Sequence, residues 1–129
     1  MSKILIQTSA GELVDKLTIL EIKKEKISDT KSLEIIEKEY LSLKKSVKEN
    51  LDLSDEINNL WAQLRKVNLK LWEIEDDIRL FEKNNSFDEK FIELARSVYK
   101  HNDNRAKIKS EINRLTGSDI KEIKQYTKY

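Results

Sequence analysis

The residues of this chain that could do chemistry gather in the middle of one expected helix, 86–115. Apolar residues recur there at steps of three and four, but His101 and Arg105 occupy two positions of that series, with Asn102 beside them. Polar groups in a dry helix interface cost roughly 1 to 3 kcal/mol each if they have no partner. The pattern therefore predicts a buried polar network, a ligand pocket or an exposed patch at this level.

The pocket interpretation draws on a second expected helix, 54–84, folded back on the first. Counting through the turn near Asn85 places 101–105 level with about 66–70, within a turn of Trp72. An arginine there could receive an anion or pair with a carboxylate. The candidate ligand-binding residues are Asn68, Trp72, Glu75, Asp76, Arg96, Tyr99, Asn102 and Arg105. In the network interpretation these polar residues fix the register of the helices, as one Asn can in a coiled coil.

Two pairs of carboxylates are spaced for a magnesium site. Glu34 and Glu37 stand three residues apart, as do Glu73 and Asp76, and the two pairs are expected on facing helices. Such pairs could hold Mg²⁺ over a nucleotide phosphate. They resemble the paired acidic motifs of the all-α nucleoside triphosphate pyrophosphohydrolases, although the gap between them is long for that family. We expect no metal and no cofactor, with Mg²⁺ kept for the alternative in which the chain is an enzyme.

A complete catalytic set is missing from the sequence. There is no Cys, the single His has no carboxylate or nucleophile at a fixed spacing, and no glycine-rich phosphate loop occurs. The 25 Lys and Arg nearly balance the 24 Asp and Glu, so no global field favours nucleic acid or an anionic membrane. No window approaches the ~18 apolar residues of a membrane span, and no signal-peptide core is present. We expect a soluble cytoplasmic protein that binds no nucleic acid and does not insert into a membrane.

The elements that must position these residues are helices. The chain has no Pro and two Gly, so nothing breaks a helix except near the ends. The stretch 54–84 carries apolar residues at alternating steps of three and four: Ile57, Leu60, Leu64, Val67, Leu71, Ile74, Ile78 and Phe81. Further helices are expected at about 10–27, 31–50 and 86–115. Short connections make neighbours antiparallel, which predicts an all-α, antiparallel four-helix bundle of two helical hairpins in a single domain, 1–129.

Capping residues predict where the helices begin and end. Ser9 with Glu12 and Ser86 with Glu89 form two capping boxes. Gly117 is the residue best suited to follow the end of the last long helix, because glycine adopts the left-handed conformation without strain.

The two ends of the chain are expected to differ. Residues 3–7 are predicted to form an extended amino-terminal arm that lies on the bundle or pairs with another copy. Ser118 is predicted to cap a short carboxy-terminal helix within 119–129. The second hairpin is longer than the first, so one end of it is expected to stand clear and to offer a surface for a second subunit.

Four separated motifs carry a resemblance to a known family. They are GELVDKLTILEIK (11–23), LWEIEDDIR (71–79), FIELARSVYKHNDNRAKIKSEIN (91–113) and GSDIKEIKQY (117–126). Together they resemble a small bacterial and phage helical domain family of unknown function, over nearly the whole chain. The resemblance implies no activity. It implies an accessory or recognition role, because the family sometimes appears attached to larger proteins connected with cell-surface polysaccharide synthesis.

The resemblance carries over a set of positions: Gly11, Glu12, Asp15, Lys16, Trp72, Glu75, Asp76, Arg79, Arg96, Tyr99, Asn102, Asp103, Arg105, Asn113, Gly117 and Ser118. His101 departs from the family pattern, which argues against a mechanism built on it. Antiparallel counting places Glu12 and Asp15 level with Asn113 and Arg114. With Lys16 these residues form a second expected polar cluster, which closes one end of the bundle.

Two functions follow from these expectations. The first is a non-enzymatic interaction or assembly module that forms a homodimer or binds another protein. The alternative is an enzyme that binds a small molecule, nucleotide or phosphate-sugar through Arg96, Arg105, Glu75 and Asp76. Enzymatic activity is uncertain on the sequence alone, and the missing catalytic set favours the first function.

Overall fold

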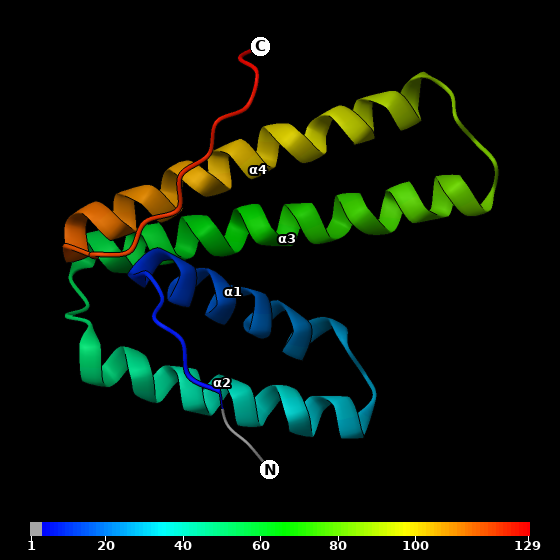
Figure 1. Cartoon of the computed structure of the whole chain (residues 1–129). Coiled ribbons are helices and arrows are strands. Elements are labelled where there is room, and N and C mark those ends of the chain that lie inside the picture. The colour runs from blue at the N-terminus through cyan, green and yellow to red at the C-terminus, as the bar shows by residue number, and fades with distance from the viewer. Residues whose placement is uncertain (1–3) are drawn as a thin grey trace.

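Four helices make up the computed structural model, which describes residues 4–129. They are α1 (Ala10–Lys26), α2 (Thr30–Asn50), α3 (Asp55–Lys83) and α4 (Glu89–Thr116). α1 and α2 form one hairpin, and α3 and α4 form the other (Figure 1). This confirms the predicted all-α fold of two helical hairpins. Residues 1–3, which include the start of the predicted arm, lie outside the described part of the chain.

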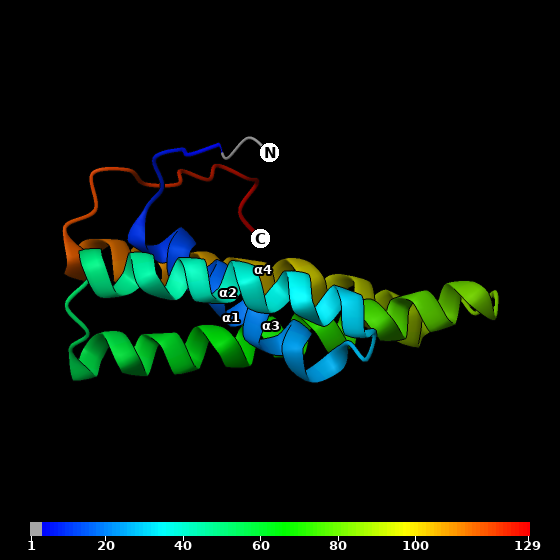
Figure 2. The ribbon, with the colours of Figure 1, turned by 90° about the horizontal axis from the view of Figure 1, so that it is seen from below.

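α1 is the helix that joins the two hairpins. It contacts α2 on one side and both α3 and α4 on the other, and it runs antiparallel to α2 and to α4 (Figure 1). Seen from below, α2 lies over α1 (Figure 2). Because α1 has neighbours on both sides, a wide face of it is buried: Val14, Leu17, Leu20 and Ile22 are at most 2% exposed.

The core lies where α1 meets the α3/α4 hairpin. Val14 of α1 packs there with Ile57, Leu64, Val67 and Leu71 of α3 and with Ile108 and Ile112 of α4. These α3 residues belong to the predicted apolar series, and each buried side chain of this size stabilises the fold by roughly 1.5 to 3 kcal/mol. The packing fixes α1 along the groove between the two long helices.

The helix ends follow the predicted caps with one exception. Ser9 caps α1, and Gly117 ends α4 in the left-handed conformation with φ of 65°. The prediction that Ser86 caps α4 is wrong. Asp88 is the cap, and its carboxylate accepts from the backbone N–H of Phe91 at 3.3 Å. The reason is that the backbone N–H of Ser86 still bonds back into the end of α3, so the new helix begins after the turn is complete.

The predicted short carboxy-terminal helix is also wrong. Residues 118–129 form no helix and run as an extended tail along α4 (Figure 1). Isolated helices this short are marginal in water, and Ile123 and Tyr126 are exposed, so no buried face supports one. Side-chain contacts hold the tail instead: Tyr129 donates to Asp103 at 2.5 Å.

The amino-terminal arm, residues 4–8, is extended and lies on the same side of the helices as the carboxy-terminal tail (Figure 2). Its three consecutive apolar residues, Ile4, Leu5 and Ile6, are 82 to 86% exposed. The described part of the arm is therefore an apolar segment that the rest of the chain leaves uncovered.

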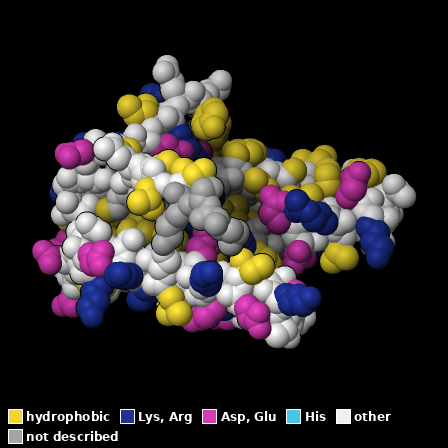
Figure 3. Space-filling model, turned by 60° about the horizontal axis from the view of Figure 1, so that its bottom comes forward, with side chains coloured by type: hydrophobic (Ala, Val, Ile, Leu, Met, Phe, Trp, Pro, Cys, Tyr) yellow, Lys and Arg dark blue, Asp and Glu magenta, His cyan; other side chains and the backbone are white. Residues whose placement is uncertain are grey.

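One end of the α3/α4 hairpin projects beyond α1 and α2, as the helix lengths predicted (Figures 1 and 2). We call this end, residues 77–98, the hairpin tip. Ile74 is the last buried residue of α3, and Ile108 is the first buried residue of α4. The structure describes all of residues 75–107 between them, and none of these is buried. Hydrophobic side chains lie between charged ones on this projecting end (Figure 3). Within residues 4–129, no helix combines the length and the apolar character needed to cross a lipid bilayer.

Candidate functional site

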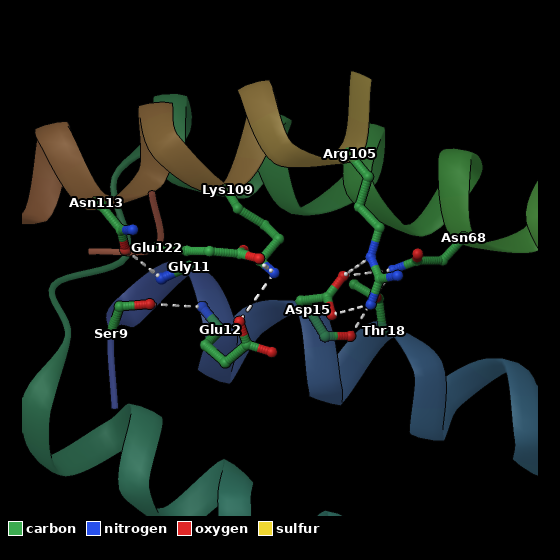
Figure 4. A network of polar contacts seen from close by, with 10 residues as sticks. All are labelled: Ser9, Gly11, Glu12, Asp15, Thr18, Asn68, Arg105, Lys109, Asn113 and Glu122. Carbon is green, nitrogen blue, oxygen red and sulfur yellow. Dashed lines mark hydrogen bonds and ion pairs between the residues drawn. The ribbon is translucent and has the colours of Figure 1, made fainter. Parts of the chain in front are cut away.

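The centre of the candidate site is an ion pair between Arg105 of α4 and Asp15 of α1 (Figure 4). Arg105 donates from Nε to Oδ1 at 2.8 Å and from Nη2 to Oδ2 at 2.5 Å. Two parallel bonds of this kind give strength and a fixed orientation. The contact with Asp15 raises the pKa of Arg105 although burial acts in the opposite direction. Asp15 is 1% exposed and the Arg105 side chain is 27% exposed, so the carboxylate lies in the interior and the guanidinium at its edge.

Asn68 brings α3 into the same network. Its side-chain amide donates to Asp15 Oδ1 at 2.9 Å and to Thr18 Oγ1 at 2.8 Å. Thr18 in turn donates to the backbone carbonyl of Asp15 at 2.7 Å. Within residues 4–129, every fully buried side-chain nitrogen or oxygen has a partner. A satisfied network of this kind fixes the register of three helices.

Lys109 carries the network one turn further along α4. Its side chain is 10% exposed, and Nζ lies 2.8 Å from Glu12 Oε2 and 2.9 Å from Glu122 Oε2 (Figure 4). Burial lowers the pKa of Lys109, but the bonds to the two carboxylates outweigh it, so that the pKa is raised. The same contact lowers the pKa of Glu122. Lys109 thereby holds α1, α4 and the carboxy-terminal tail together.

Side chains at the end of α4 accept hydrogen bonds from the first turn of α1. Asn113 Oδ1 accepts from the backbone N–H of Gly11 at 2.7 Å, and Ser118 Oγ accepts from that of Ala10 at 3.3 Å. Both N–H groups belong to the first turn of a helix, where no partner exists within the helix. A Cβ on Gly11 would lie 2.5 Å from the carbonyl oxygen of Lys109. A glycine is therefore needed for this close approach of two helices.

Three of the five residues of the second predicted cluster, Glu12, Asp15 and Asn113, belong to this network. Lys16 pairs with Glu39 of α2 at 3.1 Å, and Arg114 pairs with Glu111 of its own helix, so neither joins it. Asn113 does meet α1, at Gly11.

The two clusters predicted as separate are one, because Asp15 of the second cluster binds Arg105 of the first. Sequence reasoning missed Lys109, Thr18 and Glu122. The steps of four between Arg105, Lys109 and Asn113 could have found the lysine, because they place the three residues in one row of α4.

A cleft opens on the other side of Arg105, where α1 ends against the α3/α4 groove. Its volume is about 520 Å³, within the range of small-molecule sites. Six of the eight predicted ligand-binding residues line it: Asn68, Trp72, Glu75, Asp76, Asn102 and Arg105. Ile19, Ile22, Leu71 and Arg79 complete the lining.

The two other predicted ligand-binding residues lie outside this lining. Arg96 Nε donates to the hydroxyl of Tyr99 at 3.4 Å. The Tyr99 ring packs edge to face on Tyr129, with centroids 5.1 Å apart. The arginine that pairs with Glu75 is Arg79, one turn along the same helix.

His101 and Arg105 stand one turn apart on α4 but line two different openings. His101 lines a separate groove of about 540 Å³ between α3 and α4, with Lys66, Lys70 and other residues. Its Nδ1 lies 2.8 Å from the backbone carbonyl of Ser97. The histidine thus takes no part in the Asp15–Arg105 network.

The predicted carboxylate pairs do not face each other. α1 separates α2 from α3, and Glu37 instead pairs with Lys24 of α1 at 2.8 Å. The expectation that Glu34 and Glu37 oppose Glu73 and Asp76 is therefore wrong. Among residues 4–129, no three His, Cys, Asp or Glu side chains are grouped so that they could hold a metal ion.

Comparison with known proteins places the chain in a family. The profile described as Family of unknown function (DUF6165) matches residues 4–129. Because the match covers nearly the whole chain, the protein belongs to this family. No curated protein and no solved structure matches it.

Proposed function

We propose that this member of the DUF6165 family is a non-enzymatic assembly module whose hairpin tip binds a second copy of the chain. The observation that carries the proposal is the uncovered apolar surface of the tip. Leu80 and Ile92 are each 54% exposed, and Phe87 is 52% exposed. Natural monomers avoid large apolar patches unless the patch has a partner.

The inner residues of the tip support the same conclusion. Ile78, Phe81, Phe91, Leu94 and Val98 continue the apolar series between α3 and α4 but are half-buried. Two helices alone do not enclose such a series. A second tip related by a two-fold axis would complete a four-helix core, because the same surface then serves both partners. The nearly equal numbers of acidic and basic residues permit this self-association.

The role assigned to the polar network also supports a structural function. Arg105, Asp15 and Asn68 use their hydrogen-bonding groups on one another. The module needs no cofactor for this role.

Light scattering coupled to size exclusion tests the proposal. At micromolar concentration we expect a mass of twice 15.2 kDa. At least one of the variants Leu80→Lys and Ile92→Lys should give the monomer mass, because a lysine cannot be buried at the interface without a partner. Leu41→Lys is the matched control, since Leu41 of α2 is 59% exposed and remote from the tip. It should leave the dimer intact.

Two results would contradict the proposal. One is a monomer at high micromolar concentration. The other is dissociation by Leu5→Lys but by neither tip variant, which would place the interface at the amino-terminal arm.

A second function, a small-molecule-binding enzyme, is favoured by one observation: the cleft that collects Trp72, Glu75, Asp76, Asn102 and Arg105. A thermal-shift screen with nucleotides, nucleotide sugars and Mg²⁺ tests it. A ligand at a hundred times its Kd should stabilise the fold by about 2.7 kcal/mol. No shift across the panel would count against a nucleotide or nucleotide-sugar ligand for this cleft.

A further inference from the structure

The cleft between α1, α3 and α4 has a charge pattern that selects its ligand. Two arginines reach it, but each is already paired with a carboxylate: Arg105 with the buried Asp15, and Arg79 with Glu75. A guanidinium that already forms an ion pair with a carboxylate attracts a second anion only weakly. The cleft is therefore not arranged for a phosphate.

One charge in the cleft is left over. Asp76 lines the cleft and is exposed to solvent; among residues 4–129, no side chain forms an ion pair or hydrogen bond with its carboxylate, and none accepts from the indole N–H of Trp72. Asp15, Glu75 and Asp76 against Arg79 and Arg105 leave one negative charge. The electrostatic complement of the cleft is a single positive charge.

The rest of the wall is apolar. Ile19 and Ile22 of α1 lie in the cleft with Leu71 and Trp72 of α3. An indole face attracts a nearby cation through its quadrupole and packs against flat or branched apolar groups. Apolar walls with a few convergent polar groups are typical of small-molecule sites.

We propose that this cleft binds a small organic cation: one protonated amine or guanidinium on an apolar body. The cationic group pairs with Asp76 beside the Trp72 ring, and the apolar body packs on Ile19 and Ile22. The inference deepens the second function, because it names the ligand class of that cleft. It does not depend on the proposed dimer.

The two tryptophans provide a direct test by NMR of the indole N–H groups. Trp72 lines the cleft, whereas Trp61 donates to Glu21 at 2.8 Å and is the internal control. The probe is 2-phenylethylamine, which is cationic at neutral pH. Its matched anion is 3-phenylpropionate, which has the same ring and a chain of similar length. A Trp61→Phe variant assigns the two indole resonances.

We expect the amine to shift the Trp72 indole resonance saturably and to leave that of Trp61 in place. Asp76→Asn should weaken binding by about tenfold or more, because the charge-assisted hydrogen bond is lost. Asp77→Asn is the matched control, since Asp77 is the next residue and is exposed as Asp76 is, but does not line the cleft. Its affinity should stay within about twofold of the wild type.

Three outcomes would overturn the inference: the anion binds as tightly as the amine, the two Asp variants behave alike, or both indole resonances shift together. An unchanged Trp61 resonance in Asp76→Asn verifies that this variant is folded. Light scattering of the same samples reports the dimer separately, so failure of the cleft and failure of the assembly function are distinguishable. If nucleotides or nucleotide sugars alone shift the melting temperature, the cleft exists as a site but its assigned ligand class is wrong.

Discussion

The two halves of the α3/α4 hairpin are built from one apolar pattern but have different surroundings. In the half that α1 covers, the polar side chains of α4 that meet α1 find partners on it, as Arg105 does with Asp15 and Lys109 with Glu12. In the tip and next to it, polar side chains pair within their own helix, as Arg79 does with Glu75. The position of a third helix thus decides whether a polar residue becomes part of the interior.

The difference also explains where the fold is specified. Buried polar pairs tolerate one register, because a slip would leave each partner desolvated and unpaired. Pairs within one exposed helix impose no such restriction. We therefore expect the covered half to fix the fold and the tip to remain available for association.

The largest effect should come from Asp15→Ala. The change leaves the partly buried Arg105 and the Asn68 amide without their shared partner, and breaking such a pair costs about 3 to 5 kcal/mol. Glu75→Ala breaks the exposed pair with Arg79 and should cost at most about 1 kcal/mol. Urea unfolding of both variants checks the contrast, and equal losses would show that the two halves do not differ. If Asp15→Ala does not fold, the triple variant Asp15→Leu, Asn68→Leu and Arg105→Met should recover the fold, because apolar residues of similar volume need no partner.

Leu64→Ala and Leu94→Ala compare the apolar packing of the two halves. Leu64 is fully buried and its truncation should cost about 2 to 5 kcal/mol. Leu94 lies in the tip and is half-buried, so we expect about 1 kcal/mol. Thermal unfolding at two protein concentrations checks this, because any concentration dependence belongs to the proposed dimer. A larger loss for Leu94 at both concentrations would contradict the description of the tip.

Gly11→Ala tests how closely α1 approaches α4. The added methyl group would meet the carbonyl oxygen of Lys109 at 2.5 Å, and relieving such overpacking costs about 1 to 3 kcal/mol. Gly117→Ala is the comparison, since a Cβ there has open space and only the positive φ opposes it, at about 1 to 2 kcal/mol. Chemical denaturation of both variants measures the two changes in the free energy of unfolding. Stabilisation by Gly11→Ala, the usual result inside a helix, would mean that the helices are further apart.

The smallest effect concerns the pH dependence of the tail. The hydrogen bond from Lys109 holds the pKa of Glu122 below its ordinary value of 4.5. Its stabilising contribution is therefore complete above that value and is lost as the pH falls through the lower, folded-state pKa. Glu122→Gln should remove a pH-dependent part of roughly 0.2 to 1 kcal/mol. The measurement is urea unfolding at several pH values between neutral and acid. If the free energy of unfolding changes with pH in the same way for wild type and variant, the prediction is refuted.

The sequence predicted the helices well because their patterns are local. The apolar series of 54–84, the capping by Ser9 and the end at Gly117 each depend on a few neighbouring residues. Counting through one turn also placed Arg105 level with Asn68, and both bind Asp15.

The errors have a different origin. The tail 118–129 carries a helix-like pattern, but a short helix needs a surface on which to pack, and no local pattern shows whether one exists. Lys109 resembles the many surface lysines of this chain until α1 and the tail cover it. The arrangement of α1 between α2 and α3, which separates the predicted carboxylate pairs, likewise depends on contacts between hairpins.

The contacts of Ala10 with Ser118 and of Gly11 with Asn113 have a mechanical consequence. They join the start of one helix to the end of an antiparallel one, so tension applied between residues 9 and 118 would load them first. The pairs formed by Lys109 and Arg105 with α1 would then open in sequence, one at a time. Such an unzipping geometry resists force weakly, and a probe attached at these two positions should separate α1 from α4 before the α3/α4 hairpin yields.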